Sequence, residues 1–157
     1  MFTRTNMLTV AVFFGLLGAG CGDSFKKAET TNTEQAYQQF IIEHPGSPQV
    51  PEAKRHIREL AFAAAGNTNT IEAWDGFLKR FGDAADSDEV KQANWKLEKE
   101  EFDVAIQSAS VSTLEGVITK FPQSARLAAA RVALENAKFA VAEKANTEAE
   151  YQNFIEK

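Results

Sequence analysis

The chain has 157 residues and a formal net charge of -5, with 44% hydrophobic and 25% charged residues. This composition is ordinary for a folded globular chain and excludes a largely disordered one. The acidic balance and the lack of any Lys/Arg run longer than two residues argue against a nucleic-acid partner, which requires clustered basic side chains. The single cysteine excludes an internal disulfide.

Residues 1–20 have the layout of a secretory signal peptide. Arg4 supplies a positive charge, residues 7–17 form an apolar run, and small residues occupy positions 18–20. The apolar run is too short to cross a bilayer, which takes about 20 apolar residues. A buried N-terminal helix is the alternative, but it leaves the small residues before Cys21 unexplained. We therefore predict that residues 1–20 are removed from the mature protein.

Residues 16–21, LLGAGC, resemble the lipobox of bacterial lipoproteins, in which signal peptidase cleaves before a cysteine that carries diacylglycerol. The third residue before the cysteine is Gly18, where the family usually has leucine. The resemblance implies that Cys21 is the lipid attachment site, with palmitate among its acyl chains. Such chains contribute about 0.8 kcal/mol of membrane affinity per buried methylene. Ordinary cleavage near Gly20, which leaves a free thiol at Cys21, is the alternative.

The residue after the cysteine bears on localisation in the cell envelope. In the lipoprotein family an aspartate at this place retains the protein in the inner membrane, and here the residue is Gly22. The resemblance therefore implies the outer membrane, facing the periplasm, in a Gram-negative cell. In a Gram-positive cell it implies the outer face of the single membrane.

Residues 22–31, GDSFKKAETT, are polar and show no helical periodicity. Together with the acylated Cys21 they form a segment, 21–31, that we predict to be a flexible tether between the lipid and the folded part.

A first pattern recurs four times in residues 32–157. It consists of an anchor residue followed by apolar residues three and four positions later, and the anchors are Tyr37, Trp74, Leu114 and Tyr151. This spacing places the apolar side chains on one stripe of a helix. Pro45 and Pro122 follow the stripe, where a proline ends a helix.

A second pattern, Ser-x2-apolar-x2-Ala-x3-apolar-x4-Phe, recurs three times with identical spacing, from Ser47, Ser87 and Ser124. These serines are the predicted N-caps of second helices. The anchors are 37, 40 and 37 residues apart, and the extra three residues lie in the turn at 82–88, GDAADSD. Each second helix has two apolar faces, one for its own partner and one for the next unit, as a stacked array requires.

We therefore predict an all-α fold, an α-solenoid of helix-turn-helix repeats over 32–68, 69–108 and 109–145, with a partial repeat at 146–157. The partial repeat is interpreted either as a capping helix or as the start of a unit cut short by the gene model. Gly76 and Gly116 share one position of the first helix, where close packing against a neighbouring helix is expected and a ligand site is the alternative.

The repeats resemble tetratricopeptide (TPR) repeats of bacterial envelope proteins, with turns HPGS and FPQS similar to the YPxS turn of barrel-assembly and Tol-Pal-associated lipoproteins. The period exceeds the usual value of about 34 residues, and alanines replace the proline that closes the second helix. In this family the first helices line a concave face. The resemblance implies the following partner-binding residues: Gln35, Gln38, Gln39, Glu72, Asp75, Lys79, Glu115 and Thr119.

No pattern of catalytic or metal-ligating residues stands out. His44 and His56 lie in different predicted helices without a second cysteine, so a zinc site is not expected and His44 is predicted to be a half-buried packing residue. The acidic turn of Asp83, Asp86 and Asp88 with Glu89 lacks the spacing of a calcium loop and is predicted to be a solvated loop tip. Phosphate-binding loops and nucleophile elbows are absent from the sequence.

We therefore predict a protein that is not an enzyme and has no cofactor, metal or small-molecule substrate. The predicted function is a lipid-anchored cell-envelope scaffold that binds other envelope proteins or peptides through a TPR-like groove. The alternative is a structural subunit of an envelope machine, of the outer-membrane barrel-assembly or Tol-Pal type, without a peptide groove.

Overall fold

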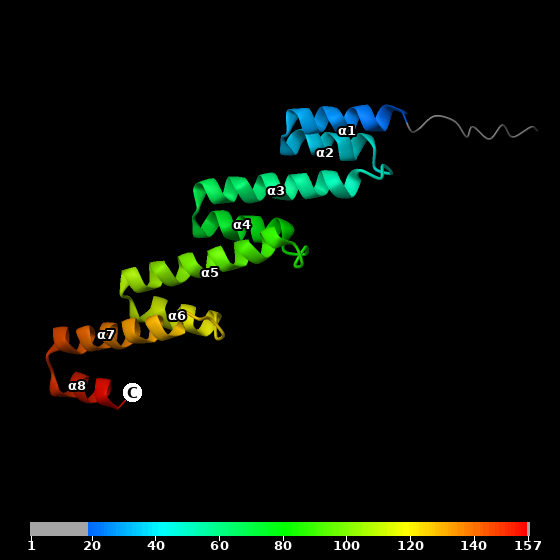
Figure 1. Ribbon diagram of the computed structural model, residues 1–157. Helices are drawn as coiled ribbons and strands as arrows, with labels where there is room; N and C mark the ends of the chain where they lie inside the picture. The colour runs from blue at the N-terminus through cyan, green and yellow to red at the C-terminus, as the bar shows by residue number, and fades with distance from the viewer. Residues whose placement is uncertain (1–18, 157) are drawn as a thin grey trace, which may run out of the picture. The chain divides into compact units, whose positions relative to one another are not determined.

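The computed structural model describes residues 19–156, and its regular elements in this range are all α-helices (Figure 1). The predicted all-α class is confirmed. Residues 1–18 of the predicted signal peptide lie outside the described residues. The helices are α1 (Ala19–Thr31), α2 (Glu34–Glu43), α3 (Val50–Thr68), α4 (Ile71–Phe81), α5 (Asp88–Ser108), α6 (Val111–Lys120), α7 (Leu127–Ala145) and α8 (Glu148–Ile155).

The chain divides into two compact units, one up to Ile57 and one from Arg58, and the division falls within α3. In the first unit α1 packs on α2. The Phe25 ring of α1 lies 5.1 Å from the Phe40 ring, and the imidazole of His56 stacks on the Tyr37 ring at 4.8 Å. Aromatic side chains therefore form the core of this unit, with α2 between α1 and the start of α3.

The prediction of a flexible tether over 21–31 is wrong, because this segment is part of helix α1. Phe25 and Ala28 are buried, at 7% and 4% exposure. Two apolar residues are too few to reveal a helical period in a polar segment, and packing on α2 supplies the stabilisation that propensity does not. Phe25 precedes the anchor Tyr37 by 12 residues, as Phe62 precedes Trp74. Helix α1 therefore has the pattern of the C-terminal half of a second helix.

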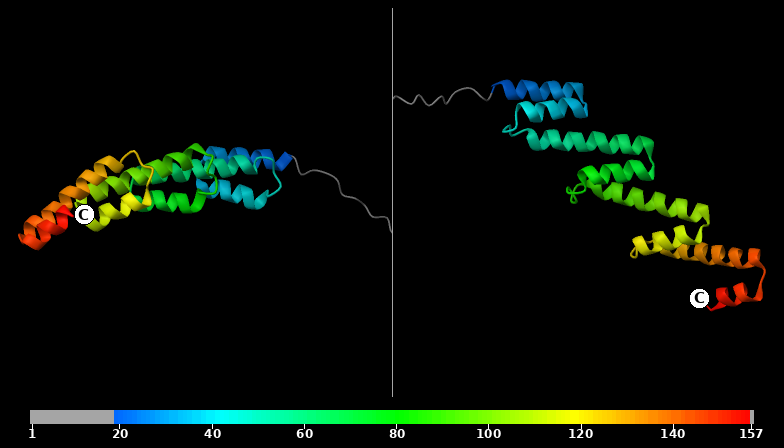
Figure 2. Two further views of the ribbon diagram at one scale, coloured as in Figure 1. Left: turned by 90° about the horizontal axis from the view of Figure 1, so that it is seen from below. Right: turned by 180° about the vertical axis from the view of Figure 1, so that it is seen from behind.

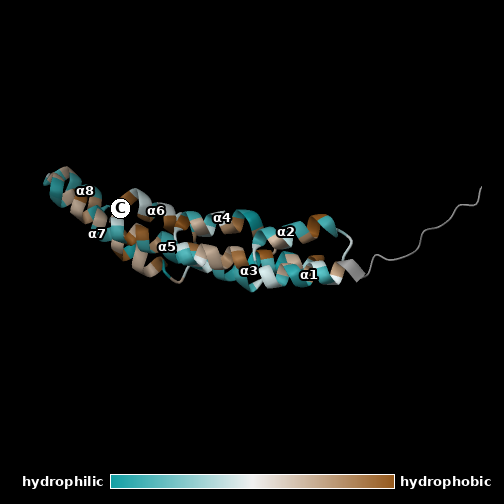
Figure 3. Cartoon of the chain, turned by 90° about the horizontal axis from the view of Figure 1, so that it is seen from above, coloured by the Kyte–Doolittle hydropathy of each residue, from teal (hydrophilic) through white to brown (hydrophobic). Residues whose placement is uncertain are grey.

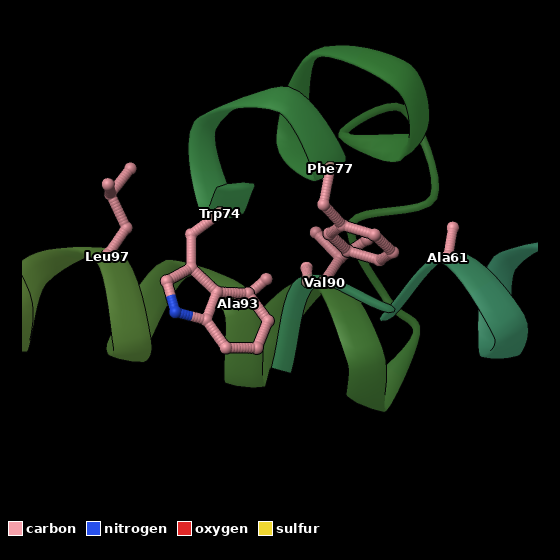
Figure 4. Packing of buried hydrophobic residues seen from close by; sticks show 7 residues of the cluster. Ala61, Trp74, Phe77, Val90, Ala93 and Leu97 are labelled. Carbon is pink, nitrogen blue, oxygen red and sulfur yellow. The ribbon is translucent and has the colours of Figure 1, made fainter. Parts of the chain in front are cut away.

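The second unit contains two core clusters with the same construction. In each, a short helix lies between the C-terminal half of one long helix and the N-terminal half of the next. Trp74 and Phe77 point from α4 toward α5 in the first cluster (Figure 4). The buried residues of the first cluster are Ala61, Ala65, Trp74, Phe77, Val90, Ala93 and Leu97. Those of the second are Phe102, Ala105, Leu114, Val117, Ala130 and Ala137.

A left-handed residue precedes each of the short helices α2, α4, α6 and α8, at Asn32, Asn69, Ala109 and Asn146. Asparagine tolerates positive φ better than most residues. In two of these joints it also accepts a hydrogen bond from the anchor aromatic: Trp74 Nε1 donates to Asn69 Oδ1 at 3.2 Å, and Tyr37 Oη donates to Asn32 Oδ1 at 3.5 Å. The third joint has Ala109 before Leu114, so the acceptor and the donor are both missing there.

The N-cap prediction is confirmed for Ser87, whose hydroxyl accepts a hydrogen bond from the Val90 N–H. It is wrong for Ser124, because α7 begins at Leu127 and Arg126 is its N-cap. The Ser124 hydroxyl instead accepts from the Arg126 N–H at 3.0 Å, in the turn before the helix. Ser47 does the same with the Gln49 N–H at 3.2 Å, three residues before α3 begins. In these two shorter turns the serine therefore lies three residues before the helix begins.

Candidate functional site

The predicted partner-binding residues all lie on the short helices, in two groups. Three are on α2 in the first unit, and five are on α4 and α6 in the second. Asp75 is half-buried and the other seven are exposed. The α2 residues are Gln35, Gln38 and Gln39; the others are Glu72, Asp75, Lys79, Glu115 and Thr119.

Several of these side chains already have partners within the molecule. Lys79 forms an ion pair with Asp75 at 2.6 Å one turn away, and Gln39 Nε2 donates to Glu43 at 2.6 Å. The Glu115 carboxylate pairs with Lys138 of α7 at 2.9 Å. Exposed pairs of this kind contribute about 0.3–0.5 kcal/mol, so a ligand can exchange them for its own hydrogen bonds at little cost.

A cleft of about 280 Å³ lies where α6, α7 and α8 meet, and Glu115 is the one predicted residue in it. Val141 and Phe154 contribute apolar side chains to its lining, next to several polar ones. Sequence reasoning missed the α7 part of this lining because it assigned binding to the first helices alone, whereas three of the lining residues come from the C-terminal half of α7. The remaining lining residues are Val111, Lys138, Ala142, Glu150 and Asn153.

Gly76 and Gly116 do not pack against a neighbouring helix, so the expected close packing is wrong. An added Cβ atom would have nothing within 4 Å at either position. Each glycine is two residues after an anchor, which places it about 200° round the helix from the core side. The two glycines therefore leave the backbones of α4 and α6 open on the side away from the core.

Cys21 is half-buried in the first turn of α1, beside a hollow of about 410 Å³ that the α2–α3 turn completes. His44 lines this hollow and packs 5.3 Å from the Phe40 ring, which confirms it as a half-buried packing residue. Among the described helices none is long and apolar enough to cross a membrane. Hydrophilic and hydrophobic residues alternate along them (Figure 3).

The acidic turn is solvated only in part. Asp83, Asp86 and Asp88 are exposed, but Glu89 accepts a hydrogen bond from Arg58 Nε at 3.1 Å, with both side chains 19% exposed. Burial raises the pKa of the Glu89 carboxyl, but hydrogen bonds from its own backbone N–H and from Arg58 outweigh it, so the net pKa is lowered. Glu89 therefore ties α3 to α5. Among the described residues no cluster of His, Cys, Asp and Glu is arranged to hold a metal ion.

No protein-family model matches the sequence, and no curated protein matches it. The function is therefore inferred from the residues and their geometry.

Proposed function

We propose that this protein is a lipid-anchored scaffold of the cell envelope, an α-solenoid of TPR-like repeats that binds other proteins or peptides. The observation that carries the proposal is the joint occurrence of a lipobox-like segment ending at Cys21 and of a helix pattern that recurs with fixed spacing. The two three-helix core clusters support it, because each packs a short helix between two long ones in the same way.

The anchor in this proposal is attached without a spacer. Cleavage before Cys21 leaves the lipid-bearing residue inside helix α1, four residues before the buried Phe25. The acyl chains are then joined to the folded part through helical backbone. The proposed location is the outer membrane, facing the periplasm, in a Gram-negative host.

The proposed binding surface of the second unit is the exposed side of α4 and α6 together with the α6–α8 cleft, and the exposed side of α2 is a separate binding surface on the first unit. Their groups are mostly polar: amides on α2, carboxylates on α4 and α6, and Lys138 beside Glu115. The open backbone at Gly76 and Gly116 lets a ligand chain approach closely. A peptide held by hydrogen bonds around a small apolar contact fits such a surface better than a wholly apolar one.

The groove is tested by changing Gln38 and Asp75 to alanine together and recovering bound envelope proteins from detergent-solubilised membranes. Gln92 and Asp103 on α5 provide a matched control pair, because Asp103 has a similar one-turn ion pair, with Lys99 at 2.5 Å. The proposal expects the first double variant to lose a partner that the control retains. Recovery of the same proteins by both would contradict the groove.

The anchor has its own test in Cys21→Ser. The variant is expected to leave the membrane fraction and to lose palmitate labelling. Continued membrane association with unchanged labelling would show that the lipobox interpretation is wrong.

A structural subunit of an envelope machine, such as a barrel-assembly or Tol-Pal type complex, is the second candidate. It is favoured by apolar side chains exposed on the long helices, among them Trp95 at 51% and Val132 at 58%. The Arg126 guanidinium lies 5.4 Å from the Trp95 ring centre and makes a cation–π contact with this exposed ring. A stoichiometric complex that survives the Gln38/Asp75 change but is lost with Trp95→Ala would favour this candidate.

A further inference from the structure

Trp95 lies on the side of α5 that faces away from the core of the second unit. It is 51% exposed, whereas Trp74, the other tryptophan of the chain, is 1% exposed. Trp95 is two residues from Ala93 and two from Leu97, which are 0% and 9% exposed. Two residues correspond to about 200° round a helix, so the indole protrudes on the side opposite to these core residues.

Three cations flank this indole. Helix α7 follows α5 along the second unit in both views of Figure 2, and the two helices are in contact. Arg126, at the start of α7, and Lys96 place their charged groups 5.4 and 5.6 Å from the Trp95 ring centre. Lys91 is exposed one turn before Trp95 on the same face of α5. Within residues 19–156 these three cations form no ion pair. The Trp95 patch consists of Trp95, Lys91, Lys96 and Arg126.

The Trp95 patch is basic although the chain as a whole has a net charge of -5. One turn after Trp95, the charge of Lys99 is paired with Asp103 at 2.5 Å, and Glu98 accepts a hydrogen bond from a serine hydroxyl at 2.6 Å. The exposed Asp88 is seven residues away, or about 10 Å along the helix axis. Because salt at about 0.1 M screens charges beyond about 10 Å, a partner at the patch responds to its local positive charge.

These residue types match the headgroup layer of a lipid bilayer. Tryptophan is enriched at this layer because its ring is apolar and its N–H is polar, and basic side chains are attracted to anionic lipids. Within residues 19–156 the Trp95 Nε1 hydrogen has no acceptor, so it is available to a headgroup. The cations stand on long stems from two helices, so they can follow the phosphates of mobile lipids. An acidic protein segment would instead need a pocket for the protruding ring.

We infer that the Trp95 patch binds the headgroup layer of membranes that contain anionic phospholipid. Each cation near an anionic surface contributes about fivefold in affinity. An acyl anchor holds a protein on a bilayer of any charge, whereas the patch makes the contact depend on anionic lipid. The inference therefore goes beyond the anchor at Cys21 and the groove on the short helices, and it depends on neither.

The test is the tryptophan fluorescence of the protein purified from cells and mixed with two kinds of vesicle. One kind is phosphatidylcholine, the other an equal mixture of phosphatidylcholine and phosphatidylglycerol, and both contain a nitroxide-labelled lipid that quenches indoles at the bilayer surface. We expect quenching and a blue-shifted emission with the phosphatidylglycerol vesicles only. Because Trp74 is buried, the change reports Trp95, and Trp95→Phe should abolish it.

The cations are tested with two double variants that remove the same charge from the second unit. Lys96→Gln with Arg126→Gln should raise the lipid concentration for half-maximal quenching about 25-fold, since two fivefold contributions are lost. Arg80→Gln with Lys144→Gln is the control, because both residues are exposed and Arg80 also lies over an aromatic ring, at 4.8 Å from its centre. The control should respond like the wild type, and circular dichroism checks that both variants are folded.

Equal quenching in the two kinds of vesicle, or equal losses in the two double variants, would overturn the inference. A blue shift of Trp95 with a soluble polyglutamate peptide but not with vesicles would overturn the lipid in favour of an acidic protein segment. Failure of the anchor would look different: the protein would not sediment with phosphatidylcholine vesicles, but its response to phosphatidylglycerol would remain.

Discussion

Phe102 and Phe139 occupy the same position of the repeated pattern, so replacing each with alanine compares a fully buried ring with a partly exposed one. Phe102 is fully buried and lies 5.7 Å from the Phe121 ring. Removing a buried phenylalanine ring costs about 3–5 kcal/mol, since contacts are lost and a cavity remains. Phe102→Ala is therefore expected to lower the free energy of unfolding by about 4 kcal/mol.

Phe139→Ala should cost much less. Its side chain is 44% exposed, so a little over half of the transfer free energy is at stake, and solvent can fill the space that it leaves. With the edge contact to Phe154 at 5.5 Å included, the loss is about 1–2 kcal/mol. Phe62, which is partly buried at the same position of α3, should give an intermediate loss.

The assay is urea denaturation of the full-length variants followed by far-ultraviolet circular dichroism. The three losses can be compared if the dependence of the unfolding free energy on urea stays the same, because that slope reports the surface exposed on unfolding. Equal losses for Phe102→Ala and Phe139→Ala, or a larger loss for Phe139→Ala, would refute the reasoning from the different burial of the two rings.

Three further predictions concern the backbone and the acidic turn. Ala109→Gly should raise the unfolding free energy by about 0.5–1 kcal/mol, because Ala109 has φ 49° and glycine adopts this conformation without strain; a loss in urea denaturation would contradict this. Gly76→Ala should stabilise by about 1 kcal/mol, since its Cβ meets nothing within 4 Å. Gly82→Ala should destabilise, since its Cβ would lie 2.6 Å from the Leu78 carbonyl oxygen, and thermal unfolding of the pair measures the contrast. The lowered pKa of Glu89 means that its stabilising contribution is present above pH 4.5 and is lost as the pH falls through the pKa of the folded state. Glu89→Gln should therefore show a smaller loss of stability on acidification than the wild type, and identical pH profiles would contradict the role of its pair with Arg58.

The repeated positions were the most predictable part of the fold. The anchors Tyr37, Trp74 and Leu114 are at most 1% exposed, as a stripe on the core side of a helix should be. Their spacing is a direct consequence of helix geometry, so it can be recognised in a single sequence. Tyr151 has the same spacing but is only half-buried, because its burial depends on a helix that covers α8, and spacing alone does not reveal whether one is present.

Helix α1 and the cleft were not predictable in the same way. Phe25 and Ala28 are part of a helix because they pack on α2. The local pattern of a ten-residue polar segment is too weak to predict this packing. The cleft is lined by side chains from α6, α7 and α8. Because α6 and α8 are not consecutive in the chain, only folding brings their side chains to the same cleft. Glu115 was predicted because it comes directly after the anchor Leu114 on a first helix. Lys138 and Val141 lie on α7, a second helix, where no binding residues were predicted.

The serine and glycine positions show a further limit of pattern reasoning. Ser87 and Ser124 have the same place in the pattern, but the longer turn in the second repeat lets only Ser87 reach the first turn of its helix. Gly76 and Gly116 also repeat, but a shared position does not say which side of the helix faces a neighbour.

The claim on which the proposed role rests most heavily is the lipid on Cys21, because it places the scaffold at a membrane surface. Mass spectrometry of the protein purified from membranes tests it directly. The account predicts an N-terminal peptide that begins at Cys21 and carries a diacylglycerol thioether with attached acyl chains. A chain that retains residues 1–20, or one that carries an unmodified thiol at Cys21, would contradict it.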